Sequence, residues 1–121
     1  AKFGRLYLNQ GNWDGTQVVP AAWVARSTRE DESIERAAYY PDTEFFGAMN
    51  GYYGYMWWGM HRAGGHDDFA AVGNHGQFVY VSPQGNLVIV RNGERYGIAY
   101  DKWLQVFFQF ASELQAHSLR R

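Results

Sequence analysis

Cysteine is absent from this chain of 121 residues, and long apolar runs are absent as well. The lack of cysteine excludes a disulfide framework and thiolate metal sites, but it leaves the compartment open, because many exported domains also lack cysteine. No apolar stretch approaches the roughly 20 residues that a membrane-spanning helix needs, and no signal-peptide pattern opens the sequence. We therefore predict no membrane span.

An excess of charge of one sign is also missing. The 11 Lys and Arg residues against 12 Asp and Glu residues leave a formal net charge of −1, and the basic residues are scattered apart from Arg120 and Arg121. This distribution gives no electrostatic footprint for nucleic acid or for an anionic membrane. Apolar residues make up 46% of the chain and aromatic residues 18%, which predicts a folded domain with a sizeable core.

The first 28 residues predict two helices. Apolar residues recur at helical spacing over Phe3–Tyr7, and Gly11 suits the position after a helix end. No capping residue precedes the first helix, so we expect a truncated chain that begins in mid-helix. Pro20 suits the first position of a second helix over 21–28, with Trp23 and Val24 facing inward.

The rest of the chain predicts short strands and one long helix. Residues 52–59 are nearly all large and aromatic, which is typical of a strand covered on both faces. Further strands are expected over 69–72, 77–82 and 87–90. A final helix from Asp101 carries an apolar face made of Leu104, Phe107, Phe108, Ala111 and Leu114. We predict an α+β fold in a single segment, 1–121: an antiparallel sheet of three to four strands with a long C-terminal helix packed on one face.

The most informative feature is a polar turn flanked by glycine. It comprises Gly73, Asn74, His75 and Gly76, and a strand follows at once from Gln77. Glycine lets a backbone approach a ligand where any Cβ would obstruct it. A strand that starts after such a turn can also hold a backbone N–H rigidly beside a reacting group. The spacing alone is equally that of an ordinary tight turn between two strands.

The flanks of this turn carry a family resemblance. They read Gly54-Tyr55-Met56-Trp57-Trp58-Gly59 and Asn86-Leu87-Val88-Ile89-Val90-Arg91. Over about residues 1–110 the chain resembles the C-terminal part of the serine β-lactamase and penicillin-binding-protein superfamily, nearest to its esterase and nylon-oligomer-hydrolase branch. The resemblance implies the later half of a β-lactamase-like α/β domain. It also implies a parent protein that cleaves a small ester or amide through an acyl-serine intermediate, without metal or cofactor; an extracytoplasmic parent is compatible with it.

The resemblance also assigns site residues. A strand beside the active site of the superfamily carries a three-residue motif, commonly Lys-Thr-Gly, and matching through the glycine places Asn74, His75 and Gly76 on it. The Gln77 backbone N–H is then implied as an oxyanion donor, with Gly76 beside it and His75 orienting the substrate. Asn74 in place of lysine argues against recognition of a substrate carboxylate. Tyr55 and Trp57 are implied as aromatic walls of the substrate pocket.

The nucleophile of the superfamily is missing from this chain. Its Ser-x-x-Lys motif needs lysine three residues after the serine, and no serine here has one: the serines are Ser27, Ser33, Ser82, Ser112 and Ser118. Tyr7-Leu8-Asn9 matches the second motif, Tyr-x-Asn, by letter only, since Tyr7 belongs to the buried face of its helix. We therefore expect the segment alone to be inactive. Its expected partner is the missing N-terminal part of the parent, or a second copy, through the edge Leu87–Asn92.

Other interpretations remain. A non-catalytic α+β binding or assembly module would explain the missing nucleophile without truncation. The histidines and aspartates at 61–68, with His75, fit no rigid metal-ligand spacing and predict a solvated loop rather than a metal site. The aromatic residues of 52–58 are expected to belong mainly to the core. They lack the interleaved basic residues that nucleic-acid stacking would need.

Overall fold

The computed structural model of the chain describes residues 1–34, 45 and 49–120. The described part begins with α1 (Lys2–Leu8), a small hairpin of β1 (Asn12–Trp13) and β2 (Thr16–Gln17), and α2 (Ala21–Thr28). The remaining elements are β3 (Gly51–Gly54), β4 (Trp57–Met60), β5 (Asp68–Gly73), β6 (Gln77–Ser82), β7 (Leu87–Arg91) and α4 (Tyr100–Ser118). No helix among these residues is long and apolar enough to cross a membrane.

The main sheet has five antiparallel strands in the order β3-β4-β5-β6-β7, each joined to the next by a hairpin. The predicted α+β class and the long C-terminal helix on one face are confirmed. The sheet has more strands than predicted because residues 52–59 do not form one strand. The chain reverses at Tyr55 and Met56, whose φ angles of 50° and 70° are those of a hairpin turn that matches the strand twist.

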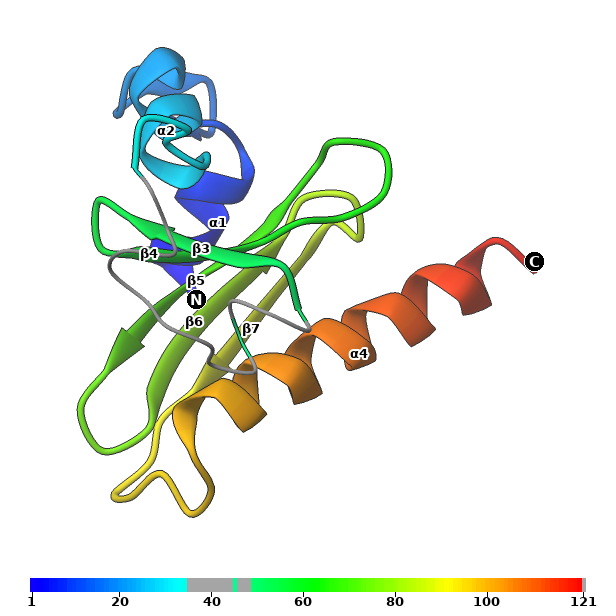
Figure 1. Cartoon of the computed structure of the whole chain (residues 1–121). Helices are drawn as coiled ribbons and strands as arrows, with labels where there is room; N and C mark the ends of the chain where they lie inside the picture. The colour runs from blue at the N-terminus through cyan, green and yellow to red at the C-terminus, as the bar shows by residue number, and fades with distance from the viewer. Residues whose placement is uncertain (35–44, 46–48, 121) are drawn as a thin grey trace.

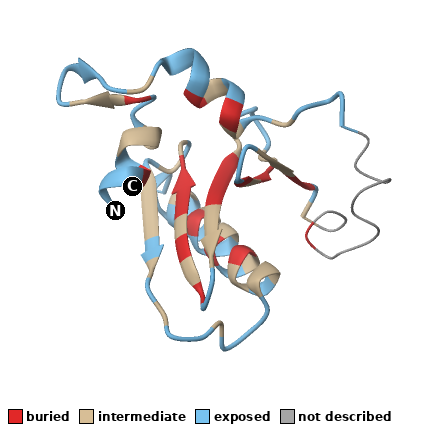
Figure 2. Ribbon diagram, turned by 90° about the vertical axis from the view of Figure 1, so that its left-hand side faces the viewer, coloured by how far each residue is buried: buried red, intermediate tan, exposed pale blue. Residues whose placement is uncertain are grey.

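Helix α4 lies along one face of the sheet, as Figure 1 shows. Its buried side chains Leu104, Phe107 and Ala111 pack on Phe78 and Tyr80 of β6, in a core that also contains Phe45, Met60 and Ala70. Figure 2 shows the buried residues concentrated on the central strands and on the helix side that faces them. The predicted apolar face of the helix is therefore correct at its centre. Leu114 at its margin is 43% exposed.

Helix α1 covers the opposite face. Trp57, Phe69 and Val81 form a second buried cluster there, against which Tyr7 and Leu8 of the helix pack. The close approach is possible because the helix carries Gly4: an added Cβ would lie 2.6 Å from Val88 Cγ1 and 2.9 Å from Val79 Cγ1. Helix α2 has the predicted bounds and buries Val24, but Trp23, predicted to face inward, is 43% exposed.

The strand register places two turns at one end of the sheet. Gly54 pairs with Trp57 and Gly73 with Gln77, while β4 and β5 run antiparallel, so the β3–β4 and β5–β6 turns lie at the same end. β4 pairs with β5 only over 68–70, whereas β6 pairs with β5 from Phe69 to Gly73. Within the described part of the chain, residues 71–73 of β5 therefore have a strand partner on one side only.

The close packing of α1 can be tested at Gly4. We expect Gly4→Val to destabilise the chain by about 1–3 kcal/mol, because the new side chain collides with Val79 and Val88 in a filled core. The measurement is urea unfolding at fixed protein concentration. Gly54→Ala is the control, since a Cβ at Gly54 meets nothing within 4 Å, and it should change the free energy of unfolding by less than about 0.5 kcal/mol. Equal losses in the two variants would contradict the packing argument.

Candidate functional site

The β5–β6 connection is the tight turn that the sequence predicts. Asn74, His75 and Gly76 join Gly73 to Gln77, and His75 and Gly76 have φ angles of 63° and 84°. The side chains of Asn74 and His75 are exposed, whereas Gly76 is buried. The turn therefore presents two polar side chains and a run of backbone groups at the end of the sheet.

Gly76 is required for a reason other than the one predicted. A Cβ at this position would lie 2.1 Å from Arg91 Nη1 and 2.8 Å from the Arg95 carbonyl oxygen. The space left free by the missing side chain is thus filled by Arg91 and not by a ligand. The expectation that this glycine opens the backbone to a ligand is corrected: its role in this chain is to admit the guanidinium.

Both polar atoms of the Gln77 side chain are hydrogen-bonded to Gly93. Its Nε2 donates to the Gly93 carbonyl oxygen, and the Gly93 N–H donates to its Oε1 at 3.2 Å. The residue begins β6, which lies between β5 and β7. Its amide side chain is therefore occupied in fixing the segment after β7, and its backbone pairs with Gly73 in the β5–β6 ladder.

The two predicted aromatic wall residues are separated by the fold. Tyr55 lies in the exposed β3–β4 turn, where its ring meets Trp23 edge-on and its hydroxyl accepts a hydrogen bond from Arg26 Nε at 3.3 Å. It lines a cleft of about 670 Å³ between α2 and residues 29–33. Trp57 instead is only 5% exposed and packs among Phe3, Tyr7 and Phe69. The structure therefore makes Trp57 a core residue and leaves Tyr55 accessible.

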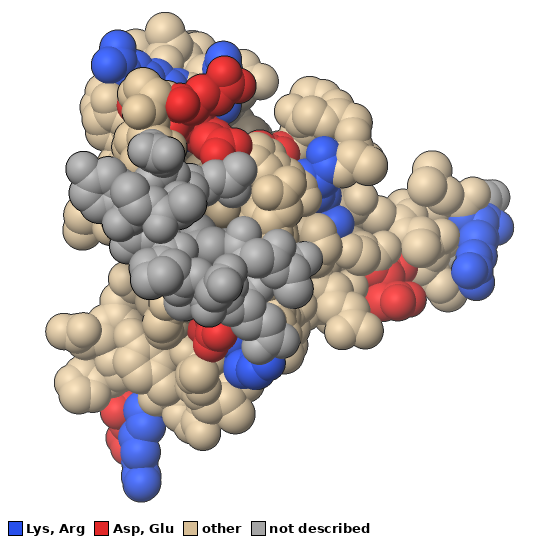
Figure 3. Space-filling model, viewed as in Figure 1, with Lys and Arg blue, Asp and Glu red and all other residues tan. Residues whose placement is uncertain are grey.

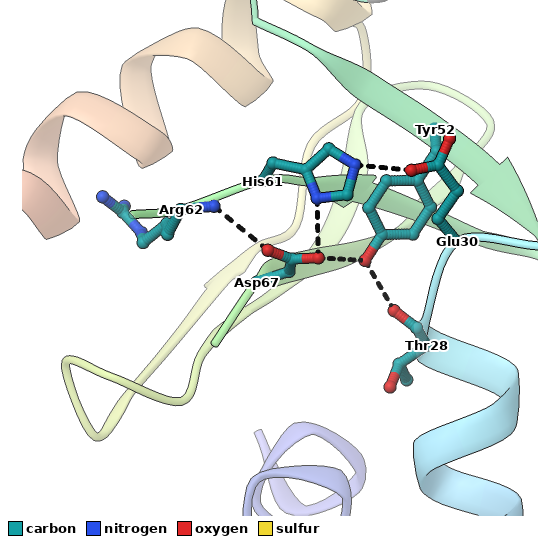
Figure 4. A network of polar contacts seen from close by, with 6 residues as sticks. All are labelled: Thr28, Glu30, Tyr52, His61, Arg62 and Asp67. Carbon is teal, nitrogen blue, oxygen red and sulfur yellow. Dashed lines mark hydrogen bonds and ion pairs between the residues drawn. The ribbon is translucent and has the colours of Figure 1, made fainter. Parts of the chain in front are cut away.

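A polar network at the other end of β4 was missed by the sequence analysis, and Figure 4 shows it. His61 lies between two carboxylates: its Nε2 is 2.7 Å from Glu30 Oε2 and its Nδ1 is 2.9 Å from Asp67 Oδ2. Tyr52 donates its hydroxyl to the Thr28 carbonyl oxygen at 2.8 Å and also lies 3.2 Å from Asp67 Oδ2. The network joins the end of α2 to the sheet.

The role of this network is to link elements of the fold. The two carboxylates lie on opposite nitrogens of His61 and cannot converge on one ion. In the part of the chain that is described, no three His, Asp or Glu residues are grouped to hold a metal. No sequence signal pointed to the network, because Glu30 and His61 are 31 residues apart.

The predicted solvated loop at 61–68 is wrong at its ends. Arg62 and Asp68 form an ion pair at 2.6 Å with side chains 8% and 0% exposed, and Tyr80 donates its hydroxyl to the same Asp68 oxygen. Arg62 also donates to Ser112 Oγ and to the Phe108 carbonyl oxygen of α4. Only the middle of the loop is exposed, from Ala63 to His66. The ends are buried because they anchor α4.

Both buried phenols should resist ionisation. Burial raises the pKa of Tyr52 and of Tyr80, and the negative charges of Asp67 and Asp68 respectively raise it further. A folded-state pKa above the unfolded value of about 10 gives stability that is full below about pH 10 and is lost as the pH rises through the folded pKa. We expect alkaline unfolding in which Tyr52 and Tyr80 ionise only as the fold is lost.

The measurement is tyrosinate absorbance recorded together with circular dichroism across alkaline pH. Tyr52→Phe should remove one tyrosine from the fraction that ionises with unfolding. Ionisation of all tyrosines before any loss of the dichroism signal would contradict the prediction.

Charges on the surface are mixed. Figure 3 shows acidic and basic side chains side by side on the face that it presents.

The fold of this chain is similar to part of a solved structure. A protein from Bacillus anthracis that is assigned as a 6-aminohexanoate-dimer hydrolase superposes with a TM-score of 0.65 at 22% sequence identity. The match covers 95% of this chain and 28% of that chain. Such hydrolases belong to the β-lactamase-like superfamily, and at this identity the likeness shows the fold alone. No protein-family model matches the chain, and no curated protein matches it in sequence.

Proposed function

We propose that this chain forms one wall of the acyl-transfer site of a β-lactamase-like serine hydrolase that cleaves an ester or amide. The observation that carries the proposal is the half-open end of β5. Among the residues that the structure describes, 71–73 have a strand partner on one side only, and they lead directly into the turn at Asn74. A strand edge of this kind can pair with an extended substrate, and backbone N–H groups at a rigid turn can stabilise an oxyanion. The fold shared with a nylon-oligomer hydrolase supports this assignment.

The turn contains two candidate backbone donors. Gln77 N–H is the donor that the resemblance implies, and Asn74 N–H lies next to the half-open residues of β5. Asn74 and His75 side chains are exposed and can contact a substrate, and Tyr55 lies at the same end of the sheet. Trp57 has no part in the proposal because it is buried. Removal of one such donor typically lowers kcat by a factor of about 10²–10³.

The serine has to come from outside these 121 residues. The chain spans 28% of the length of the structure that it matches, and none of its own serines is followed by lysine at the required spacing. The activity of a larger enzyme is therefore part of the proposal, with the nucleophile and its base supplied by other sequence.

We expect the isolated chain to have no acyl-hydrolase activity. It should not turn over nitrocefin or p-nitrophenyl esters, and it should take no label from fluorophosphonate or penicillin probes. The measurement is intact-mass spectrometry after incubation with each probe. Stoichiometric labelling of one serine would contradict this part of the proposal.

A second function from another class is favoured by one observation. Helices α1 and α4 cover both faces of the sheet within these residues, so the chain has a core of its own. A non-catalytic binding or assembly module would need nothing more. The sequence upstream of Ala1 decides between the two functions, because the hydrolase requires a Ser-x-x-Lys and a Tyr-x-Asn motif there.

The partner surface is proposed at the β7 edge. Among the described residues β7 pairs with β6 only, so its other side presents unpaired backbone groups, which are a template for strand addition. Helix α4 carries an exposed apolar row away from the residues that contact Arg62: Val106, Phe110 and Leu114 recur at every fourth position and are 43–51% exposed. The edge and the apolar row together fit a strand from the rest of the parent or from a second copy.

We expect the isolated chain to self-associate through this surface. Sedimentation at micromolar concentration should show an oligomer, and Phe110→Glu should shift it towards the monomer because the new charge would be buried in the contact. Leu119→Glu is the matched control, since Leu119 is exposed directly after the end of α4 and lies outside the apolar row. A compact wild-type monomer with protected amides along β7 would refute the proposal and favour the binding module.

A further inference from the structure

A single guanidinium ties the β5–β6 turn to the segment between β7 and α4. Arg91 is the last residue of β7. Its Nη1 donates to the Gly76 carbonyl oxygen at 2.5 Å, and its Nη2 donates to the carbonyl oxygens of Arg95 and Tyr96 at 3.1 and 3.5 Å. One side chain therefore bridges backbone carbonyls of two separate segments.

The site of this guanidinium is shaped for it. A Cβ on Gly76 or on Gly93 would lie 2.1 or 2.2 Å from Arg91 Nη1, so the guanidinium can take this position only because both residues lack a side chain. The ring of Trp103 forms the floor, with its centre 4.4 Å from Arg91 Cζ. In the described part of the chain no carboxylate lies within ion-pair distance of Arg91. Its partners are carbonyl groups and a ring, so its role is to bind backbone and not to neutralise an acid.

The other end of the turn is held from the same segment. Tyr96 donates its hydroxyl to the Gly73 carbonyl oxygen at 2.9 Å, and the Tyr96 carbonyl in turn accepts a hydrogen bond from Trp103 Nε1 at 2.6 Å. The Gln77 side chain pairs with Gly93 in this segment as well. Both ends of the turn are thus fastened to the residues after β7.

These contacts fix the direction of the two candidate donors. In a trans peptide the C=O and N–H groups lie in one plane and point in opposite directions. The Gly76 carbonyl shares its peptide unit with the Gln77 N–H, and the Gly73 carbonyl shares its unit with the Asn74 N–H. Arg91 therefore orients the Gln77 N–H, and Tyr96 orients the Asn74 N–H. The positive charge on the first carbonyl also polarises its peptide, which strengthens the N–H as a donor.

We propose that Arg91 is a positioning residue, assisted by Tyr96, which holds the backbone donors of the turn in fixed orientations. The statement that the turn is clamped rests on this geometry alone. Its catalytic consequence rests on the proposed function, because an oxyanion donor acts through preorganisation and loses its effect when it can turn away.

The clamp is tested in the 121-residue chain by ¹⁵N relaxation. Arg91→Lys keeps the charge but loses the fork that reaches three carbonyls, and it should lower the order parameter of the Gln77 N–H from the rigid value of about 0.85 towards about 0.6. Tyr96→Phe removes one hydroxyl and should lower the order parameter of the Asn74 N–H. Arg5→Lys is the control, because Arg5 also stacks on a tryptophan, Trp13, at 4.6 Å. It should leave the turn unchanged.

Unchanged order parameters at Gln77 and Asn74 in both variants would overturn the clamp. If Arg91→Lys loosens the strands as a whole, Tyr96→Phe decides, since it changes a single hydrogen bond. The second readout uses the polypeptide that contains this chain together with its Ser-x-x-Lys part. There Arg91→Lys should lower kcat for a p-nitrophenyl ester on the order of tenfold or more with KM nearly unchanged. A rise in KM alone would overturn the positioning role. No acyl transfer by the unaltered enzyme would refute the proposed function, while relaxation still decides the clamp.

Discussion

The pairing of β5 with β6 is the constraint on which the rest of the structure depends. With Gly73 opposite Gln77, Phe78 and Tyr80 face α4 while Val79 and Val81 face α1. A slip of one residue would exchange these two sets and place each against the wrong helix. The same register puts the turn beside Arg91, because Phe78 pairs with that residue on the other side of β6. The core and the clamped turn therefore follow from one alignment of two strands.

Much of the fold was predictable because its signals are local. The bounds of α2 and β6 agree with the predictions, since Pro20 and the run of β-branched and aromatic residues after Gln77 act over a few residues. The β3–β4 hairpin was not predicted. Its turn places Tyr55 and Met56 in left-handed conformations, and neither position has glycine, asparagine or aspartate. Because these usual turn residues are missing, the run of aromatic residues predicts a single strand.

The candidate site was predicted less well, and for a physical reason. Sequence shows that a side chain is missing at Gly76 but not what fills the space, and here the space belongs to Arg91. Likewise Tyr55 and Trp57 look alike as aromatic wall residues, but one lies in the turn and the other in the core. The network around His61 joins residues that only the tertiary fold brings together. No spacing along the chain announces such contacts.

The two ends of the sheet differ in what holds them. At one end, Arg62, Asp68 and Tyr80 anchor α4 with side-chain groups that are almost fully buried. At the other end, the contacts that hold the turn are made mainly to its backbone carbonyls, which leaves the exposed side chains of Asn74 and His75 without a packing role. A turn fixed through its backbone can keep its N–H groups in place while its side chains vary. That combination suits a wall whose reactive groups are supplied by another part of the protein, because the wall contributes orientation and needs no nucleophile of its own.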